Sequence, residues 1–205
     1  MKALILHADA QGLKKAVEIL KKGGLVIYPT ETAYGIGCDA TSKKAVKRLF
    51  RIKKRSSKKP LSVIFGSMNR LNRYVYLDKH GITLIKSFMP GPLTLVAKPK
   101  KRLPGSPRNE IAFRIPSGKF ALSLAKSFPK PITATSANVS GEKPVYAFGD
   151  AFELFRDKID AIVDGGRLPK RKVSTVFNLI AMKTVRKGAV SEAKIKKCLL
   201  RKRAR

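Results

Sequence analysis

Acidic residues are scarce in this sequence of 205 residues: 13 Asp and Glu stand against 45 Lys and Arg, which gives a formal net charge of +32 at pH 7. So large an excess of one sign repels itself in a compact chain and favours association with polyanions. Ten basic residues and no acidic residue fall within residues 43–59, and nine basic residues accompany the single Glu192 within residues 186–205. The composition predicts nucleic acid, nucleotide polyphosphate or both as partners, with a solvated helical face and basic tail as the plain alternative.

Histidine and cysteine are nearly absent, which excludes several kinds of chemistry. His7 and His80 are the only histidines, and neither stands in a pattern typical of a catalytic triad or a HExxH zinc site. Cys38 and Cys198 lie far apart and form no CxxC pair, so a disulfide framework has no support. The SGK run at residues 117–119 lacks the upstream glycine of a Walker A loop. We predict no metal site among the side chains.

Long apolar runs are also missing. No run approaches the ~18–20 residues that a membrane span requires. The apolar run near the N-terminus ends after a few residues, too early for a signal peptide. We expect a cytoplasmic protein without membrane contact.

The N-terminal part of the sequence shows clear helix and strand patterns. Apolar residues recur at helical spacing over residues 13–20, with Asp9 as the predicted N-cap and glycines at 23–24 as the stop. The apolar run at residues 25–28 then predicts a buried strand, which Pro29 ends. A polar motif follows directly.

Strand and helix patterns alternate along the rest of the chain. Interleaving of this kind favours a mixed α/β (α+β) sheet, and we place a single catalytic domain at residues 1–200 and a basic tail at 201–205. Further strands are predicted at residues 61–65, 94–97, 111–115, 132–135, 160–163 and 176–180, and further helices at 42–53, around 71, and at 82–88, 120–127, 151–155 and 191–200.

Hydroxyl groups and cations, rather than carboxylates or imidazoles, recur in the predicted loops. They occur in YPTETAYGIG at residues 28–37, TATSANVSG at 133–141 and KVSTVFNL at 172–179. Such groups orient small polar substrates, while Lys and Arg neutralise phosphate charge. An enzyme built this way works by positioning and electrostatics, although each hydroxyl taken alone is more often a turn or cap device.

Taken together, these segments resemble the YrdC-like L-threonylcarbamoyladenylate synthases. The matching motifs stand in the family's order and span roughly residues 9–200. They are YPTETAYGIG, KKRSSKKPL at 53–61, PGPLT at 90–94, FRIP at 113–116, TSANVSG at 135–141, DGG at 164–166, ST at 174–175 and VRKGAV at 185–190.

The resemblance implies a YrdC/RibB-like fold, in which a twisted, mostly open mixed sheet flanked by helices surrounds a basic concave cavity. The implied reaction converts L-threonine, bicarbonate or CO2, and ATP into threonylcarbamoyl-AMP and pyrophosphate. ATP would enter with Mg as a substrate complex, with no tightly bound cofactor. A separate threonylcarbamoyl-transferase complex would use the product to make N6-threonylcarbamoyladenosine in tRNA. The SAN triplet favours the synthases over a related group that lacks it.

The resemblance also implies roles for individual residues. Lys53, Arg55 and Thr32 would form the catalytic group, and the guanidinium of Arg114 would pair with the threonine carboxylate. No role follows for Glu31. The implied threonine site comprises Thr30, Tyr34, Arg114 and Ser174, and the implied ATP site comprises Lys53, Arg55, Lys59, Ser136, Asn138, Ser140 and Arg186.

Several alternatives stay open. Arg114 follows an apolar run and could be a buried ion-pair partner, Lys53 and Arg55 could belong to a generic basic face, and Tyr34 could be core. A different function, a basic protein that binds tRNA or double-stranded RNA in translation or ribosome assembly, also fits the charge, although no RNP-like aromatic motif supports it. Departures from the family's pattern occur at Asn109, Glu110, Asn178 and Lys187.

Overall fold

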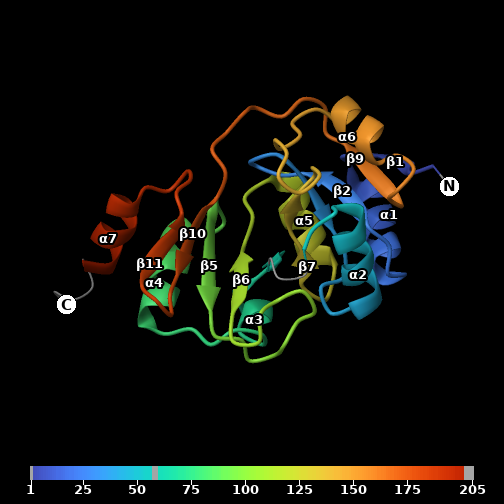
Figure 1. Cartoon of the computed structure of the whole chain (residues 1–205). Helices are drawn as coiled ribbons and strands as arrows, with labels where there is room; N and C mark the ends of the chain where they lie inside the picture. Colours follow the sequence, from blue (N-terminus) through green and yellow to red (C-terminus); the bar gives the residue numbers. More distant parts are fainter. Residues whose placement is uncertain (1, 57–59, 201–205) are drawn as a thin grey trace.

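The structure is a computed structural model that describes residues 2–56 and 60–200, and in this part of the chain seven helices and eleven strands alternate (Figure 1). The helices are α1 (Ala10–Lys21), α2 (Lys43–Ile52), α3 (Met68–Leu71), α4 (Lys79–Phe88), α5 (Lys119–Ser127), α6 (Phe148–Phe155) and α7 (Glu192–Leu200). The strands are β1 (Leu4–His7), β2 (Val26–Pro29), β3 (Tyr34–Gly37), β4 (Ser62–Ile64), β5 (Leu93–Ala97), β6 (Ile111–Arg114), β7 (Ile132–Thr133), β8 (Thr135–Ser136), β9 (Ala161–Asp164), β10 (Thr175–Asn178) and β11 (Lys183–Arg186).

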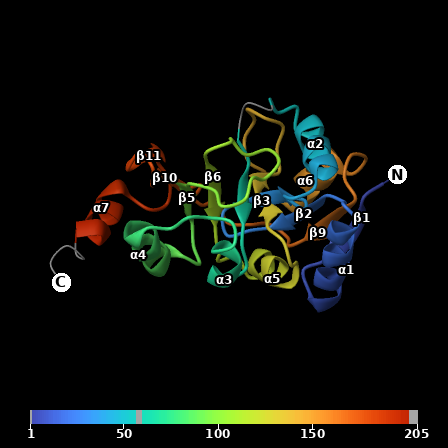
Figure 2. The same cartoon turned by 90° about the horizontal axis from the view of Figure 1, so that it is seen from below.

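The strands form two mixed sheets. The first has the order β1-β9-β2-β3-β8 and the second has the order β11-β10-β5-β6-β4-β7. Seen from below, α4, α3, α5 and α1 lie along one side of the sheets, and α2 and α6 lie on the other (Figure 2). The predicted mixed α/β fold with flanking helices is confirmed, but the single sheet that we expected is divided in two.

A short segment at residues 132–136 passes from one sheet to the other. β7 pairs with β4 of the second sheet, and after Ala134 the chain continues as β8, which pairs with β3 of the first. The N–H of Thr133 donates to the carbonyl of Cys38, and the N–H of Cys38 donates to Oγ1 of Thr133, each over 2.9 Å. Because one residue separates β7 from β8, this segment fixes how the two sheets meet.

Strand β2 shows why an uninterrupted apolar run appears in the sequence. Val26 and Tyr28 face the cluster beneath α1 and α5, whereas Ile27 faces the cluster beneath α2 and α6. Side chains alternate between the faces of a strand, so a strand covered by helices on both sides is apolar throughout. The predicted strand is confirmed, shifted by one residue to Val26–Pro29.

The sequence predicted a local helix cap correctly, but it predicted the strands less well. Asp9 caps α1 by accepting from the N–H of Gly12 over 2.8 Å, as the sequence predicts. The sequence placed YPTETAYGIG in a predicted loop, but its second half, Tyr34–Gly37, is strand β3 and pairs antiparallel with β2. The predicted strand at residues 132–135 is divided between β7 and β8, and β1 and β11 were not predicted.

The predicted tail at 201–205 lies outside the described residues. Within the described residues, no helix has the length and apolar character needed to cross a bilayer.

Gly37 supplies a test of the junction between the sheets. A Cβ at this position would lie 2.7 Å from Cγ2 of Ile132, 2.8 Å from Cε1 of Tyr28 and 3.0 Å from the carbonyl oxygen of Thr133. We expect Gly37→Ala to lower the free energy of unfolding by about 1–3 kcal/mol in chemical denaturation, because it overpacks this contact. Gly149→Ala is the matched control, since its Cβ would meet nothing within 4 Å. Equal stability of the two variants would contradict the tight junction.

Candidate active site

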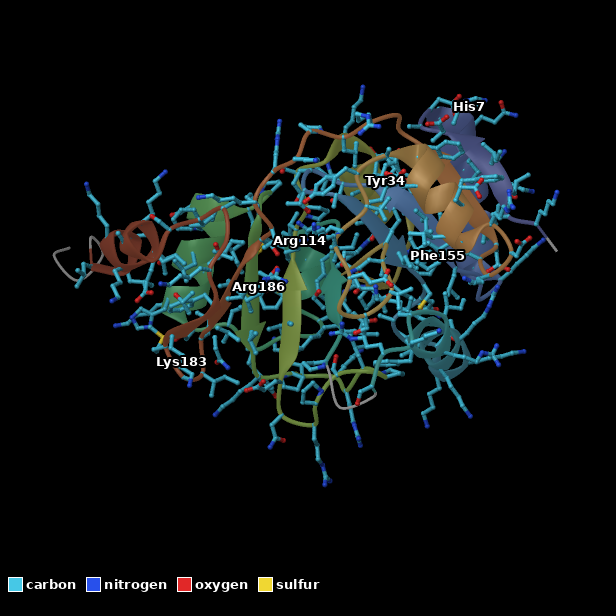
Figure 3. All side chains as sticks on the ribbon, turned by 45° about the horizontal axis from the view of Figure 1, so that its top comes forward. His7, Tyr34, Arg114, Phe155, Lys183 and Arg186 are labelled. Atoms are coloured by element: carbon cyan, nitrogen blue, oxygen red, sulfur yellow. The ribbon has the colours of Figure 1, made fainter. Side chains whose placement is uncertain are left out.

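A cavity of about 510 Å³ lies between the two sheets, and both contribute to its walls. The loop between β2 and β3 and strand β8 come from the first sheet, and strands β5, β6, β10 and β11 come from the second. Arg114 and Arg186 project near the middle of the molecule, with Tyr34 on the side of the first sheet (Figure 3). Nine predicted substrate-binding residues line this cavity: Thr30, Thr32, Tyr34, Arg55, Arg114, Ser136, Asn138, Ser174 and Arg186.

The loop of residues 30–33 is closed by the hydroxyl of Thr30. Its Oγ1 donates to the carbonyl of Ala33 over 2.6 Å and accepts from the N–H groups of Thr32 and Ala33 at 3.2 and 3.3 Å. Oγ1 of Thr32 lies 3.2 Å from Oγ1 of Thr30. The turn chemistry and the cavity-lining position therefore coexist in the same two threonines.

Arg114, which lines the cavity, forms a buried ion pair with Glu31 beside it. Nη1 of Arg114, at the end of β6, donates to Oε1 of Glu31, and the side chains are 9% and 7% exposed. Oε2 of Glu31 accepts the N–H of Gly118, the residue before α5, over 3.2 Å. The ion pair that the sequence left open for Arg114 is present, and Arg114 also lines the cavity.

A chain of hydrogen bonds orders the opposite wall. Oγ1 of Thr94 donates to Oγ of Ser174 over 3.0 Å. Arg186 donates from Nε and Nη2 to the carbonyl of Ser174, at 3.1 and 2.8 Å, and from Nη2 to its hydroxyl at 2.9 Å. The guanidinium is thereby oriented beside the cavity by Ser174, the residue before β10, which Thr94 of β5 holds in turn.

We predicted that Lys53 binds phosphate, but the residue does not line the cavity. The residue is 1% exposed, and its Nζ donates to the carbonyls of Ser136 and Asn138 at 2.5 and 2.6 Å and to Oδ1 of Asn138 at 3.1 Å. Oδ1 of Asn138 also accepts the hydroxyl of Ser136 over 2.6 Å. Lys53 therefore holds the SAN segment from behind, and Ser136 and Asn138 line the cavity.

Of two further predicted residues, Ser140 lies beside this segment and Lys59 lies outside the described residues. The N–H of Ser140 donates to the carbonyl of Lys53 over 2.9 Å, and Ser140 does not line the cavity. Arg55 lines the cavity and donates from Nη2 to the carbonyl of Pro60 over 2.8 Å.

Tyr34 joins the core and the cavity wall. The residue is fully buried, its hydroxyl donates to the carbonyl of Gly166 over 2.8 Å, and it accepts the N–H of Gly165 over 2.9 Å. Burial raises the pKa of this phenol. Tyr34 thus fastens the DGG segment to β3, which combines the two interpretations that its sequence position allowed.

Three arginines, Arg55, Arg114 and Arg186, line the cavity together with the carboxylates of Glu110 and Glu142. Burial lowers the pKa of Arg55, and burial together with the nearby charge of Arg114 lowers the pKa of Arg186. Gathering guanidinium groups in this way is costly for an empty site and favours an anionic ligand. Within residues 2–56 and 60–200, no group of three or more His, Cys, Asp or Glu side chains is arranged to hold a metal ion.

Sequence reasoning missed two residues of the site. Glu31 stood in the quoted motif without a role, because its partners Arg114 and Gly118 are 83 and 87 positions away. Thr94 ended the PGPLT motif, which could have drawn attention to it. His7 lies at the outer edge of the molecule, away from Arg114 (Figure 3).

Fold and site together define a class: mixed α/β proteins that surround one cavity with guanidinium and hydroxyl groups. Residues 18–188 match the model of the Sua5/YciO/YrdC family, which carries the description "Telomere recombination". The chain belongs to this family.

Similar proteins come from several organisms. A protein of Methanocaldococcus jannaschii, provisionally named a threonylcarbamoyl-AMP synthase, is 33% identical over 95% of this chain and 96% of its own. The threonylcarbamoyl-AMP synthase of Pyrococcus abyssi is 35% identical over 82% of this chain, which spans only 50% of that protein.

Solved structures agree with these relationships. The crystal structure of P. abyssi Sua5 complexed with L-threonine superposes with a TM-score of 0.87 at 31% identity, and it covers 97% of this chain and 61% of that one. The crystal structure of Escherichia coli YciO superposes with a TM-score of 0.83 at 27% identity, over 95% of this chain and 98% of that one.

Lys53→Met tests the support of the SAN segment. It would remove the ammonium donor from three oxygen acceptors, of which the Ser136 carbonyl and Oδ1 of Asn138 each keep one other donor. We expect a loss of at least about 2 kcal/mol in the free energy of unfolding. The control is Lys47→Met, an exposed position on α2, the helix that Lys53 follows as its C-cap residue. Equal stability of both variants in urea titrations would contradict a supporting role.

The pH dependence of stability gives a second readout of Lys53. Burial, with a smaller effect of Arg55, lowers the pKa of Lys53 from 10.5 to about 8. Between these values the unfolded chain binds more protons than the folded one, so the contribution of Lys53 to unfolding free energy rises with pH. Wild type should therefore gain stability relative to Lys53→Met as the pH rises from 8 towards 10. A flat difference across this window would contradict the lowered pKa.

Proposed function

We propose that this protein is a threonylcarbamoyl-AMP synthase, which forms L-threonylcarbamoyladenylate and pyrophosphate from L-threonine, CO2 or bicarbonate, and ATP. One observation carries the proposal: a single cavity gathers Arg55, Arg114 and Arg186 with hydroxyl groups from both sheets. The family and the names of the similar proteins support the same activity.

The chemistry needs little acid–base work from the protein. The amine of threonine adds to CO2 and loses a proton to solvent, which gives a carbamate. A carbamate oxygen then attacks the α-phosphorus of ATP, and the bond from that phosphorus to the oxygen of pyrophosphate breaks. Because the substrate is the nucleophile, catalysis consists of alignment and charge compensation.

We assign the two ends of the cavity to the two substrates. Arg114 would bind the threonine carboxylate, for which a planar guanidinium is suited. The remaining side chains divide between threonine, with Thr30, Thr32, Tyr34 and Ser174, and the nucleotide, with Arg55, Ser136, Asn138 and Arg186.

Lys53 then acts as a positioning residue, because its amino group is occupied by Ser136 and Asn138. Mg enters with ATP as part of the substrate complex. We further propose that a threonylcarbamoyl-transferase complex takes the product and modifies tRNA.

The reaction itself is the primary test. Purified protein with L-threonine, bicarbonate, Mg and ATP should release pyrophosphate only when threonine is present, and threonylcarbamoyl-AMP should appear by mass spectrometry. Pyrophosphate release that is independent of threonine, or none at all, would overturn the proposal.

Arg114→Lys tests the assignment of the threonine end. The lysine keeps the charge opposite Glu31 but loses the guanidinium fork, at a cost of about 1.5–3 kcal/mol for a charged hydrogen bond. We expect the KM for threonine to rise about tenfold or more, with little change in the KM for ATP. Arg108→Lys, at an exposed position, is the control. Parallel changes in both KM values would contradict the assignment.

We also propose direct contact with tRNA, on the strength of one observation. Lys43, Lys44 and Lys47 are exposed on α2, in a stretch without acidic residues. Basic side chains on one helical face bind phosphate backbones without base specificity.

Salt dependence tests this contact. Joint substitution of Lys44 and Lys47 by Ala should reduce the slope of log affinity for tRNA against log salt by about 2. The same change at Lys14 and Lys15, which are exposed on α1, is the control. An unchanged slope in the α2 variant, measured by fluorescence anisotropy, would remove the contact from the account.

A further inference from the structure

Glu31 does not itself line the cavity, but its neighbours Thr30 and Thr32 and its partner Arg114 do. It lies in the loop that joins β2 and β3 of the first sheet, and Arg114 lies on β6 of the second. The ion pair between Glu31 and Arg114 joins a loop of the first sheet to a strand of the second. Both side chains are less than 10% exposed. The pair therefore fastens the loop to the opposite wall.

The second carboxylate oxygen makes this attachment rigid. Oε2 accepts the N–H of Gly118, which immediately precedes α5. The positive end of a helix stabilises a carboxylate placed there. The loop also packs closely on Gly118, because a Cβ at this position would lie 2.7 Å from the nitrogen of Glu31 and 3.0 Å from the carbonyl carbon of Thr30.

The remaining donors of Arg114 are available to a ligand. Among the described residues, the recorded hydrogen bond of its guanidinium uses Nη1, and Arg114 lines the cavity. A guanidinium presents five N–H donors in a fixed fork. Binding one edge to Glu31 thus sets the direction in which the others point, and the same carboxylate sets the position of Thr30 and Thr32.

We propose that Glu31 is a positioning residue that sets the width of the amino-acid pocket, by holding the loop of residues 30–33 at a fixed distance from Arg114. The proposal rests on the proposed function and deepens it. It also gives the SGK run at residues 117–119 a role: its glycine forms the third point of attachment. The pocket selects threonine because its two walls cannot separate.

Two variants loosen the attachment in different ways. Glu31→Gln keeps the shape but places an amide NH2 where one of two donors, Arg114 or Gly118, requires an acceptor. Gly118→Ala keeps both charges and displaces the loop. For each we expect the KM for threonine to rise about tenfold to a hundredfold, with the KM for ATP nearly unchanged. Gly149→Ala, with no atom within 4 Å of its Cβ, is the matched control.

Selectivity provides a readout that a purely structural role would not move. One methyl group distinguishes threonine from serine, and a well-formed pocket gains about 10–200-fold from such a group. Glu31→Gln and Gly118→Ala should lower the ratio of kcat/KM for threonine over serine, measured at a temperature where circular dichroism shows each variant folded.

Each outcome decides between explanations. Unchanged KM and selectivity in folded variants would leave Glu31 a structural ion pair and overturn the proposal. A lower threonine KM in Glu31→Gln would show that the carboxylate competes with the substrate for Arg114, and would overturn it as well.

Calorimetric titration of wild type with L-threonine, without ATP, separates this inference from the proposed function. If wild type does not bind L-threonine, the proposed function is refuted. If wild type and Glu31→Gln bind L-threonine equally, only the inference about Glu31 is refuted. If a variant does not fold, the other variant carries the test.

Discussion

The buried ion pair between Glu31 and Arg114 is the constraint on which the cavity depends. An isolated charge at this depth would cost several kcal/mol in solvation, so each partner is tolerated only because the other is present. The pair joins the first sheet to the second at a point where their strands do not hydrogen-bond to each other. The chain crosses between the sheets at residues 132–136 and at other segments, and this pair adds an electrostatic connection beside the cavity.

The chain's large positive charge acquires a local meaning from this arrangement. Most lysines are exposed, whereas Arg114 is buried and Arg55 is half-buried. The three arginines that line the cavity are oriented by hydrogen bonds to Glu31, Ser174 or backbone carbonyls. Orientation before binding is what allows fixed charges to stabilise a polyphosphate without reorganisation. Lys53 contributes to the same end indirectly, since it holds the segment that presents Ser136 and Asn138.

Local sequence signals predicted local structure well. Asp9 was recognisable as a helix cap because a cap depends on residues three positions away, and its side chain accepts the expected N–H group. The motifs likewise indicated the cavity-lining threonines and arginines. Sheet pairing, in contrast, joins distant segments. The division into two sheets and the identity of Tyr34–Gly37 as a strand could not follow from a glycine-rich stretch with turn character.

The side chains that sequence reasoning misjudged have distant partners. Lys53 was predicted to contact phosphate, but its three acceptors belong to residues more than 80 positions away. Glu31 could not be placed for the same reason. A motif identifies which residues gather at a site, whereas the packing of two sheets decides which of them face the ligand and which hold the others in place.

A crystal structure of the protein with L-threonine and a non-hydrolysable ATP analogue tests the central claim most directly. The account predicts the threonine carboxylate on the guanidinium of Arg114, on the edge away from Glu31, and the phosphates near Arg55 and Arg186. Phosphate bound to Arg114, or threonine outside the cavity, would contradict it.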